Sequence, residues 1–454
     1  MAIATVNPAT GEQLDSYEPY DASRCDAVLD AAQRAQRDWG QIDPSGRADT
    51  LRRLADLLRE RVGEYASLVT REMGKPITQA RGEIDKCASC VEHYVEHGPG
   101  YLEAMSVEMG VRVSGARYLP LGVVLGVMPW NYPFWQVLRF AVPALLAGNG
   151  IVLKHASNVP GSALALERLL SDAGLPEGLF GVVLVEGGAV TPLIHDDRIA
   201  AVSLTGSEAV GRRIGAEAGA ALKPAVLEPG GSDPFIVLAD ADVEAAAKAA
   251  TIARTLNNGQ SCIAAKRFIV ADALYEEFVD SAATAMSALV VGDPADPDVE
   301  LGPIARSGLR DELHDQIRAT VAEGARLVIG GEVPEGPGAY YPATLMADAR
   351  PGMVGFDEEL FGPAAAVVRA RDEAAIVELA NASRFGLGAS IWTSDPDHAL
   401  DLGKRIQSGM IFVNDLVRSD PRIPFGGVKA SGYGRELGPH GIREFVNVQT
   451  VYAR

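Results

Sequence analysis

Residues 123–128 read Val123-Val124-Leu125-Gly126-Val127-Met128, a short apolar run with no polar face. Such a run predicts a strand that is buried on both sides of a sheet. Three similar runs come later in the chain, and each run is followed by a loop and a helical pattern: 150–153, 181–185 and 201–204. Buried strands that alternate with helices indicate a parallel α/β sheet, and we predict a nucleotide-type domain here.

A second α/β series begins at 235–238 and predicts a second domain of the same class. Its further runs are 267–270, 327–329, 364–368 and 411–413. The break between the two series lies near Glu228-Pro229-Gly230-Gly231. Before the first series, apolar residues recur at helical spacing over 23–58 and 80–97. A chain of 454 residues is too long for one core, which agrees with two or three domains.

Two further strand signals lie outside these series. Residues 111–113 and 117–119 flank Gly115 and predict a hairpin with its turn at that glycine. The C-terminal segment 445–452 alternates apolar and polar residues. We expect it to be a strand that pairs with an element outside its own sheet.

The composition is that of a globular enzyme with an acidic surface. Hydrophobic residues make up 47% of the chain and charged residues 22%. The net charge of −19 repels nucleic acids and anionic membranes, so neither is an expected partner. Four scattered cysteines form no disulfide framework, and the N-terminus shows no signal peptide. Because the longest apolar stretch is also too short to cross a bilayer, we expect a cytoplasmic protein.

The strongest chemical signal is Asn257-Asn258-Gly259-Gln260-Ser261-Cys262. A cysteine behind a Gly-Gln turn can present its sulfur at a backbone bend, where N–H groups also face an incoming carbonyl. A carboxylate elsewhere in the fold can move protons for it. A thiol nucleophile with a separate base indicates covalent catalysis on an aldehyde or acyl group.

Other candidate residues follow predicted strands, where ligands of open α/β sheets sit. Asn131, in 129–134, can offer its amide to an oxyanion or cap a rigid turn. Lys154 and Ser157 suit a ribose or phosphate, or a solvated lysine and a helix cap. The stretch Thr205-Gly206-Ser207 starts a helix whose N–H groups suit a pyrophosphate, although it lacks the usual glycine fingerprint.

Two later loops also have two interpretations. Glu359, in the segment 358–363, can place a carboxylate on a ribose or belong to a charged turn. The segment 424–432, with Gly426-Gly427 beside Lys429, suits a bent loop near a ligand or a plain surface turn.

Cys87, Cys90, His93 and His97 have the residue types of a metal site but lie in a helical pattern. Ligands spread over ten residues of one helix span roughly 15 Å, which is too far for one tetrahedral zinc ion. We therefore predict two buried thiols and surface histidines, and no metal site.

The order and spacing of these segments together resemble the aldehyde dehydrogenase superfamily, from Asn7-Pro8-Ala9-Thr10-Gly11 to the final strand. Within it the chain looks most like the succinate-semialdehyde dehydrogenases. The resemblance implies a Rossmann-like cofactor domain, an α/β catalytic domain and a small β oligomerisation domain, in a homodimer or homotetramer. The implied boundaries are 1–107 with 121–229, then 230–432, and 108–120 with 433–454.

The resemblance also implies catalytic roles. Cys262 matches the nucleophile, and its oxyanion adduct would be held by the Asn131 amide and the Cys262 N–H. Glu228 matches the residue that activates water for thioester hydrolysis. Glu436 matches a second acid that helps to relay the proton.

For the cofactor, the resemblance implies a nicotinamide dinucleotide. Lys154 matches a lysine near the adenosine ribose, and Trp130 lines that groove. Ser207, with Thr205 and Gly206, meets the pyrophosphate. The remaining matches, on the nicotinamide half, are Glu359 and Phe361.

Ser157 departs from the NAD-preferring pattern, which has a glutamate at this position. A carboxylate there would repel a 2′-phosphate, whereas a serine beside the charge of Lys154 can donate a hydrogen bond to it. We therefore expect NADP as the cofactor, with NAD as the alternative.

For the substrate, Arg139 and Ser419 match residues that bind the distal carboxylate of succinic semialdehyde. An unpaired buried arginine would be costly without an anion, but Arg139 has a second interpretation as a helix arginine paired with an acid. A second substrate arginine of some relatives is replaced by Leu256, and Arg254 is a weak substitute. We expect a small aldehyde with a distal carboxylate. The alternatives are another short aldehyde such as glutaric semialdehyde, used with NAD, and a thiol esterase without a cofactor.

Overall fold

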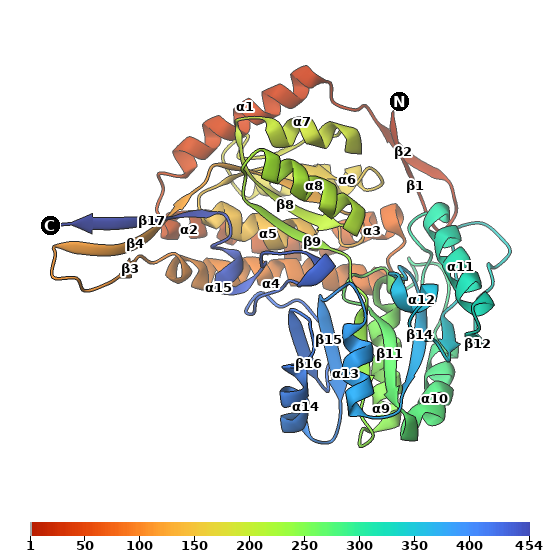
Figure 1. The fold of residues 1–454 in the computed structure, drawn as a ribbon. Coiled ribbons are helices and arrows are strands. Elements are labelled where there is room, and N and C mark those ends of the chain that lie inside the picture. The colour runs from red at the N-terminus through yellow and green to blue at the C-terminus, as the bar shows by residue number, and fades with distance from the viewer. Residues whose placement is uncertain (1) are drawn as a thin grey trace.

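The computed structural model describes residues 2–454, and Figure 1 shows their arrangement. The first α/β series forms a five-stranded sheet in the order β7-β6-β5-β8-β9, with every pair parallel. The predicted parallel sheet is therefore confirmed. Its strands are β5 (Val123–Met128), β6 (Gly150–His155), β7 (Phe180–Val182), β8 (Ile199–Gly206) and β9 (Ala225–Pro229).

Helices surround this sheet. The helical stretch predicted over 23–58 is divided into two helices. The second helix begins after Asp43, whose side chain caps it by accepting hydrogen bonds from the N–H groups of Ser45 and Gly46. The helices are α1 (Ala22–Trp39), α2 (Pro44–Glu60), α3 (Val62–Met73), α4 (Ile77–Tyr101), α5 (Trp135–Leu146), α6 (Pro160–Asp172), α7 (Val190–His195) and α8 (Glu208–Ala220), with the 3₁₀ turn η1 (Gly187–Ala189).

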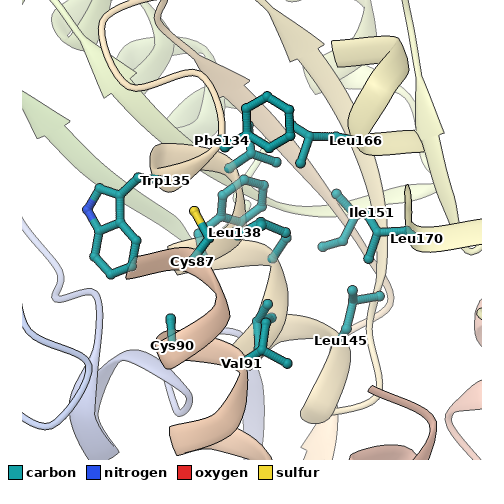
Figure 2. Packing of buried hydrophobic residues seen from close by; sticks show 14 of the residues in the cluster. Cys87, Cys90, Val91, Phe134, Trp135, Leu138, Leu145, Ile151, Leu166 and Leu170 are labelled. Carbon is teal, nitrogen blue, oxygen red and sulfur yellow. The ribbon is translucent and has the colours of Figure 1, made fainter. Parts of the chain in front are cut away.

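Helix α4 carries the metal-like residues, and their predicted helical placement is confirmed. Cys87 and Cys90 are fully buried, in a cluster that includes Trp135 and Leu138 of α5 (Figure 2). His97 is exposed and His93 is half-buried. The two thiols therefore contribute to the packing of α4 on α5, which positions both helices beside the site described below.

The second series forms a seven-stranded sheet in the order β12-β13-β14-β11-β10-β15-β16, with β12 antiparallel to its neighbour. The sequence did not predict β13 or β15. The strands are β10 (Asp233–Val237), β11 (Ala265–Ala271), β12 (Arg326–Ile329), β13 (Thr344–Ala347), β14 (Ala364–Ala370), β15 (Gly388–Trp392) and β16 (Met410–Val413). The helical segments that follow β10 along the chain are α9 (Val243–Thr255), α10 (Tyr275–Ser287), α11 (Ser307–Ala322), α12 (Val354–Asp357), α13 (Glu373–Asn381), α14 (Pro396–Gly403) and α15 (Gly438–Gly441), with η2 (Leu256–Gly259), η3 (Asp272–Leu274) and η4 (Lys429–Ser431).

A three-stranded antiparallel sheet, in the order β17-β4-β3, projects from the body in Figure 1. The predicted C-terminal strand is confirmed as β17 (Val446–Ala453), and it pairs with β4 (Val113–Pro120). The predicted hairpin turn at Gly115 is wrong, because Gly115 lies inside β4. A Cβ there would lie 1.9 Å from the Met105 carbonyl oxygen, so the glycine permits the close approach of β3 (Met105–Ser106).

Two N-terminal strands, β1 (Ile3–Val6) and β2 (Gln13–Tyr17), form a separate antiparallel pair. Across residues 2–454, no helix has the length and apolar character needed to cross a membrane.

Candidate active site

Cys262 follows a bend in which three consecutive residues have left-handed backbone angles. The φ values of Asn257, Asn258 and Gly259, in η2, are +57°, +56° and +72°. Asparagine tolerates this region and glycine adopts it freely, so the sequence permits the bend. A Cβ on Gly259 would also lie 2.3 Å from backbone atoms of Gly362, so the close approach requires glycine.

Buried hydrogen bonds anchor this bend. The Asn258 amide donates to the carbonyl oxygens of Gly74 and Pro303 at 2.8 and 2.9 Å. Its oxygen accepts the N–H of Gly302 at 2.7 Å. Because the amide nitrogen makes two hydrogen bonds and the amide oxygen makes one, this side chain fixes the backbone ahead of Cys262.

Two buried cations hold the same loop through its carbonyl groups. The Lys266 ammonium donates to the carbonyl oxygens of Ser261 and Cys262, each at 2.9 Å. Arg254 donates to the carbonyl of Gly259 from a fully buried position. The structure therefore places Arg254 among the supports of the loop, away from the substrate role that the sequence weakly suggested.

Asn131 lies against the nucleophile loop, as the sequence predicted for an oxyanion donor. The side-chain amide nitrogen of Asn131 donates to the Gln260 carbonyl at 2.9 Å, and the backbone carbonyl of Asn131 accepts from the side-chain amide of Asn257 at 2.8 Å. Within residues 2–454, the Cys262 N–H has no hydrogen-bond acceptor. An amide and a free N–H at one bend are the donors that a developing oxyanion needs.

Glu228 approaches the loop from the end of β9. The segment after it is close to the nucleophile, because a Cβ on Gly231 would lie 2.6 Å from the Cys262 carbonyl oxygen. Glu228 is buried, and in the described part of the chain neither carboxylate oxygen has a hydrogen-bond partner. Burial raises the pKa of Glu228 well above its usual value, and Glu436 raises it further. Such a carboxyl group is suited to taking a proton from water.

Glu436 is the partner of Arg139. The two side chains form a buried ion pair on the wall of the site, and Arg139 also donates to the Thr205 hydroxyl at 3.1 Å. Burial raises the pKa of Glu436, whereas the charge of Arg139 lowers it. This contact matches the second interpretation of Arg139, a helix arginine paired with an acid.

Burial raises the pKa of the Cys262 thiol to about 12, although Arg139 and Lys266 both act to lower it. The thiol is therefore protonated at neutral pH in this arrangement. A base must remove its proton when the sulfur attacks, since the thiolate is the nucleophile.

The predicted cofactor residues gather at the carboxyl edge of the five-stranded sheet. Strand order reverses between β5 and β8, which is the position where such sheets bind ligands. Trp130 follows β5, Lys154 lies on β6 with Ser157 just beyond it, and Ser207 follows β8. The same edge also includes Thr205 and Gly206 at the end of β8.

This edge fits an anionic dinucleotide. Lys154 has no acid partner within residues 2–454, and Ser157 and Ser207 are exposed. Ser207 occupies the N-cap position of α8, but its side chain makes no capping hydrogen bond. The N–H groups at the start of this 13-residue helix are therefore open to a phosphate.

Glu359 and Phe361 join this edge to the nucleophile loop. The Glu359 carboxylate lies 3.3 Å from the Lys266 ammonium and accepts the Gly231 N–H at 3.0 Å. The rings of Phe361 and Trp130 meet edge to face, with centroids 5.7 Å apart. The structure thus brings the predicted cofactor and catalytic residues together.

A cavity of about 260 Å³ lies beside Cys262. This volume is at the small end for ligand sites, so the cavity suits a small molecule. Ser419 lines it, as predicted, and its hydroxyl accepts hydrogen bonds from Lys86 at 2.7 Å and Trp135 at 3.1 Å. Arg139 and Phe425 are also in the wall, so Phe425 is the residue of the segment 424–432 that reaches the cavity.

The pattern of the Aldehyde dehydrogenase family matches residues 1–451. The chain belongs to the aldehyde dehydrogenase family. The similarity to solved structures also extends over nearly the whole chain. The structure of succinic semialdehyde dehydrogenase from Streptococcus pyogenes in complex with NADP+ superposes with a TM-score of 0.96 at 36% identity, covering 99% of each chain.

Two relatives in this family have similar lengths and higher identity. Succinate semialdehyde dehydrogenase [NAD(P)+] Sad of Escherichia coli strain K12 is 49% identical over 99% of this chain and 97% of its own. Succinate-semialdehyde dehydrogenase [NADP(+)] 1 of Mycobacterium tuberculosis strain H37Rv is 46% identical over the full length of both chains.

Sequence reasoning missed Lys86 and Lys266 in this member of the family. Lys266 lies in the strand β11, and a lysine in a strand gives no signal that it will bind carbonyl groups of a preceding loop. Lys86 lies on α4, where a charged residue usually marks the solvent face of a helix. Only the packing of α4 against α5 shows that Lys86 faces the cavity.

Proposed function

We propose that this aldehyde dehydrogenase oxidises succinic semialdehyde to succinate with NADP. The observation that carries the proposal is the convergence of Cys262, Asn131 and Glu228 beside a small cavity and the carboxyl edge of a parallel sheet. The names of the relatives, which specify succinate semialdehyde and NADP(+) or NAD(P)+, support the choice of substrate and cofactor.

The first step is addition of the Cys262 sulfur to the aldehyde carbon. The thiol proton leaves to a base, and the carbonyl electrons move onto oxygen. The Asn131 amide and the Cys262 N–H stabilise that oxyanion. Lys266 keeps the loop in place by binding the carbonyl groups of Ser261 and Cys262.

NADP+, when bound, supplies a hydride acceptor. Loss of the hydride from the Cys262 adduct restores the carbonyl and leaves a thioester. We assign Lys154, Ser157, Trp130, Ser207 and the adjacent Thr205-Gly206 to the adenosine and pyrophosphate side. We assign Glu359 and Phe361 to the nicotinamide side.

The second step is hydrolysis of the thioester. Glu228 takes a proton from water, the water oxygen attacks the thioester carbon, and the C–S bond breaks to release the acid and the Cys262 thiolate. We assign to Glu436, which is in the ion pair with Arg139 and acts on the pKa of Glu228, the relay of that proton away from Glu228. The covalent intermediate separates oxidation from hydrolysis, so one cavity serves both.

We also propose that the chain works as a cytoplasmic homodimer or homotetramer. The projecting sheet would form the contact, because its edge strand β17 exposes Val448 (58%) and Tyr452 (51%). An edge strand with exposed apolar residues is a site for pairing with another chain. Light scattering of the intact protein and of a Val448→Lys variant tests this, and a monomeric parent would contradict it.

The test of the function compares four substrates with NADP and with NAD. The substrates are succinic semialdehyde, glutaric semialdehyde, butanal and an ester that a thiol nucleophile can cleave. Formation of NADPH with the highest kcat/KM for succinic semialdehyde supports the proposal. Ester hydrolysis without reduction of either cofactor would instead favour an esterase.

A further inference from the structure

We propose that Lys86 binds the distal carboxylate of the substrate, together with Ser419. This inference rests on the proposed function and names the group that selects its substrate. It assigns to Lys86 the charge recognition that the sequence assigned to Arg139. The argument depends on the charges and donors that line the cavity.

The charges of the cavity wall cancel except at Lys86. Lys75 pairs with Glu83, and both side chains are about 1% exposed. Arg139 pairs with Glu436. Arg418, at the exposed rim, lies 3.0 Å from Asp415. Within residues 2–454, Lys86 has no acidic partner, so the wall has one uncompensated positive charge.

Lys86 is held without being neutralised. Its ammonium group donates to the Ser419 hydroxyl at 2.7 Å and lies 4.3 Å from the centre of the Trp135 ring. These contacts use one N–H, which leaves further ammonium protons for a ligand. A partly buried lysine that lacks an acid is expensive unless an anion completes its site.

Ser419 is arranged to donate to the same anion. Its oxygen already accepts hydrogen bonds from Lys86 and from the Trp135 indole N–H. Its own proton is therefore left to donate. An ammonium and a hydroxyl that both donate form a receptor for a carboxylate, since an ionised carboxylate only accepts.

The receptor and the nucleophile share one small cavity. Gln79 of α4 accepts the Asn257 N–H at 2.7 Å and so marks the wall beside the nucleophile loop. Lys86 is seven residues further, about 10 Å along the helix axis. Because Cys262, Lys86 and Ser419 all line the same cavity of about 260 Å³, the substrate that we propose is a short chain with an aldehyde at one end and a carboxylate at the other.

The experiment compares succinic semialdehyde with butanal, which has the same carbon number and no carboxylate. Lys86→Met should raise the KM for succinic semialdehyde about 10- to 100-fold, because a charge-assisted contact is lost, and should change kcat/KM for butanal less than about threefold. Lys86→Arg should restore most of the affinity. Lys404→Met, which removes an exposed lysine just after α14, is the matched control and should leave the kinetics with both substrates unchanged.

A second readout avoids oxidation of the semialdehyde. Succinate, which carries the distal carboxylate, should inhibit butanal oxidation by the parent more strongly than butyrate, the product of that reaction, and Lys86→Met should weaken the inhibition by succinate about tenfold or more. Lys86→Gln gives a second uncharged variant if Lys86→Met folds poorly. Equal losses for both aldehydes, or unchanged inhibition by succinate, would overturn the role of Lys86.

The two proposals fail in different ways. If the parent oxidises butanal as efficiently as succinic semialdehyde, the proposed substrate is wrong. If the parent prefers succinic semialdehyde and Lys86→Met keeps that preference, only the assignment of Lys86 is wrong.

Discussion

The guanidinium group of Arg139 lies against the carboxylate of Glu436, and both side chains are only 3% exposed. The pair connects the substrate cavity to Glu228, because the charge of Glu436 raises the Glu228 pKa and that of Arg139 lowers it. Arg139 thus influences the hydrolytic base and keeps a buried acid neutralised. Its charge is already compensated before any substrate arrives.

Removal of Arg139 should therefore affect every aldehyde. Arg139→Met leaves Glu436 buried without a partner and should cost about 3–5 kcal/mol of stability. Thermal unfolding and kcat/KM with succinic semialdehyde and butanal measure the two effects, and both kcat/KM values should fall together. The double variant Arg139→Met with Glu436→Gln should recover much of the lost stability. A rise in KM confined to succinic semialdehyde would return Arg139 to the carboxylate role expected from the sequence.

Glu228→Gln should separate the two chemical steps. Without the base, hydrolysis slows while oxidation continues, so mixing enzyme with excess substrates should give a burst of NADPH close to one per active site. Stopped-flow absorbance measures the burst, and Glu444→Gln is a nearby carboxyl control. Loss of the burst itself would mean that Glu228 acts before the thioester forms.

The pH dependence of turnover follows from the same residue. Because the Glu228 pKa is raised, the base is lost on acidification at a higher pH than for an ordinary glutamate. Where hydrolysis limits turnover, kcat should fall as the pH falls through that raised pKa. The acidic limb of the kcat profile should disappear in Glu228→Gln, and an unchanged limb would assign it to another group.

Lys86 predicts a second pH effect, at alkaline pH, on the KM for succinic semialdehyde. Burial lowers its pKa to about 8, with Arg139 as the next cause, while Cys87, Cys90 and Glu83 act to raise it. The ammonium is therefore lost as the pH rises past about 8, and KM for succinic semialdehyde should increase there. The KM for butanal should show no such rise. Lys86→Arg should move the rise in the KM for succinic semialdehyde to a pH above the range that is assayed. Parallel rises for both aldehydes would point to a group at the nucleophile.

Ser157→Glu tests the choice of cofactor. A carboxylate beside the Lys154 position would repel the 2′-phosphate of NADP and accept hydrogen bonds from the ribose of NAD. The ratio of kcat/KM values for NADP and NAD should fall at least about tenfold. Ser157→Ala is the control, because it removes the hydroxyl without adding charge and should have a smaller effect. An unchanged ratio in Ser157→Glu would refute the charge argument.

The regular parts of the fold were predictable because buried parallel strands have a local signature. The run 123–128 has the same limits as β5, and the candidate residues Asn131, Lys154 and Ser207 follow strands whose carboxyl ends share one edge. The error at Gly115 arose because glycine serves both turns and close strand contacts. Only the position of Met105 in space distinguishes the two.

The charge pattern of the cavity could not be predicted from the sequence. Arg139 and Glu436 are far apart along the chain and meet only because Glu436 pairs with Phe425 through backbone hydrogen bonds. Lys86 meets Ser419 only because α4 packs beside the segment that contains Ser419. Such pairings decide which cation is free, and no local pattern encodes them.

The most direct test of the central claim is NADPH absorbance when purified protein meets succinic semialdehyde and NADP. The parent should form NADPH and succinate in equal amounts, at a higher kcat/KM than with NAD. Cys262→Ala should retain cofactor binding and form neither product. Absence of reduction with both cofactors across all the aldehydes, or full activity in Cys262→Ala, would contradict the account.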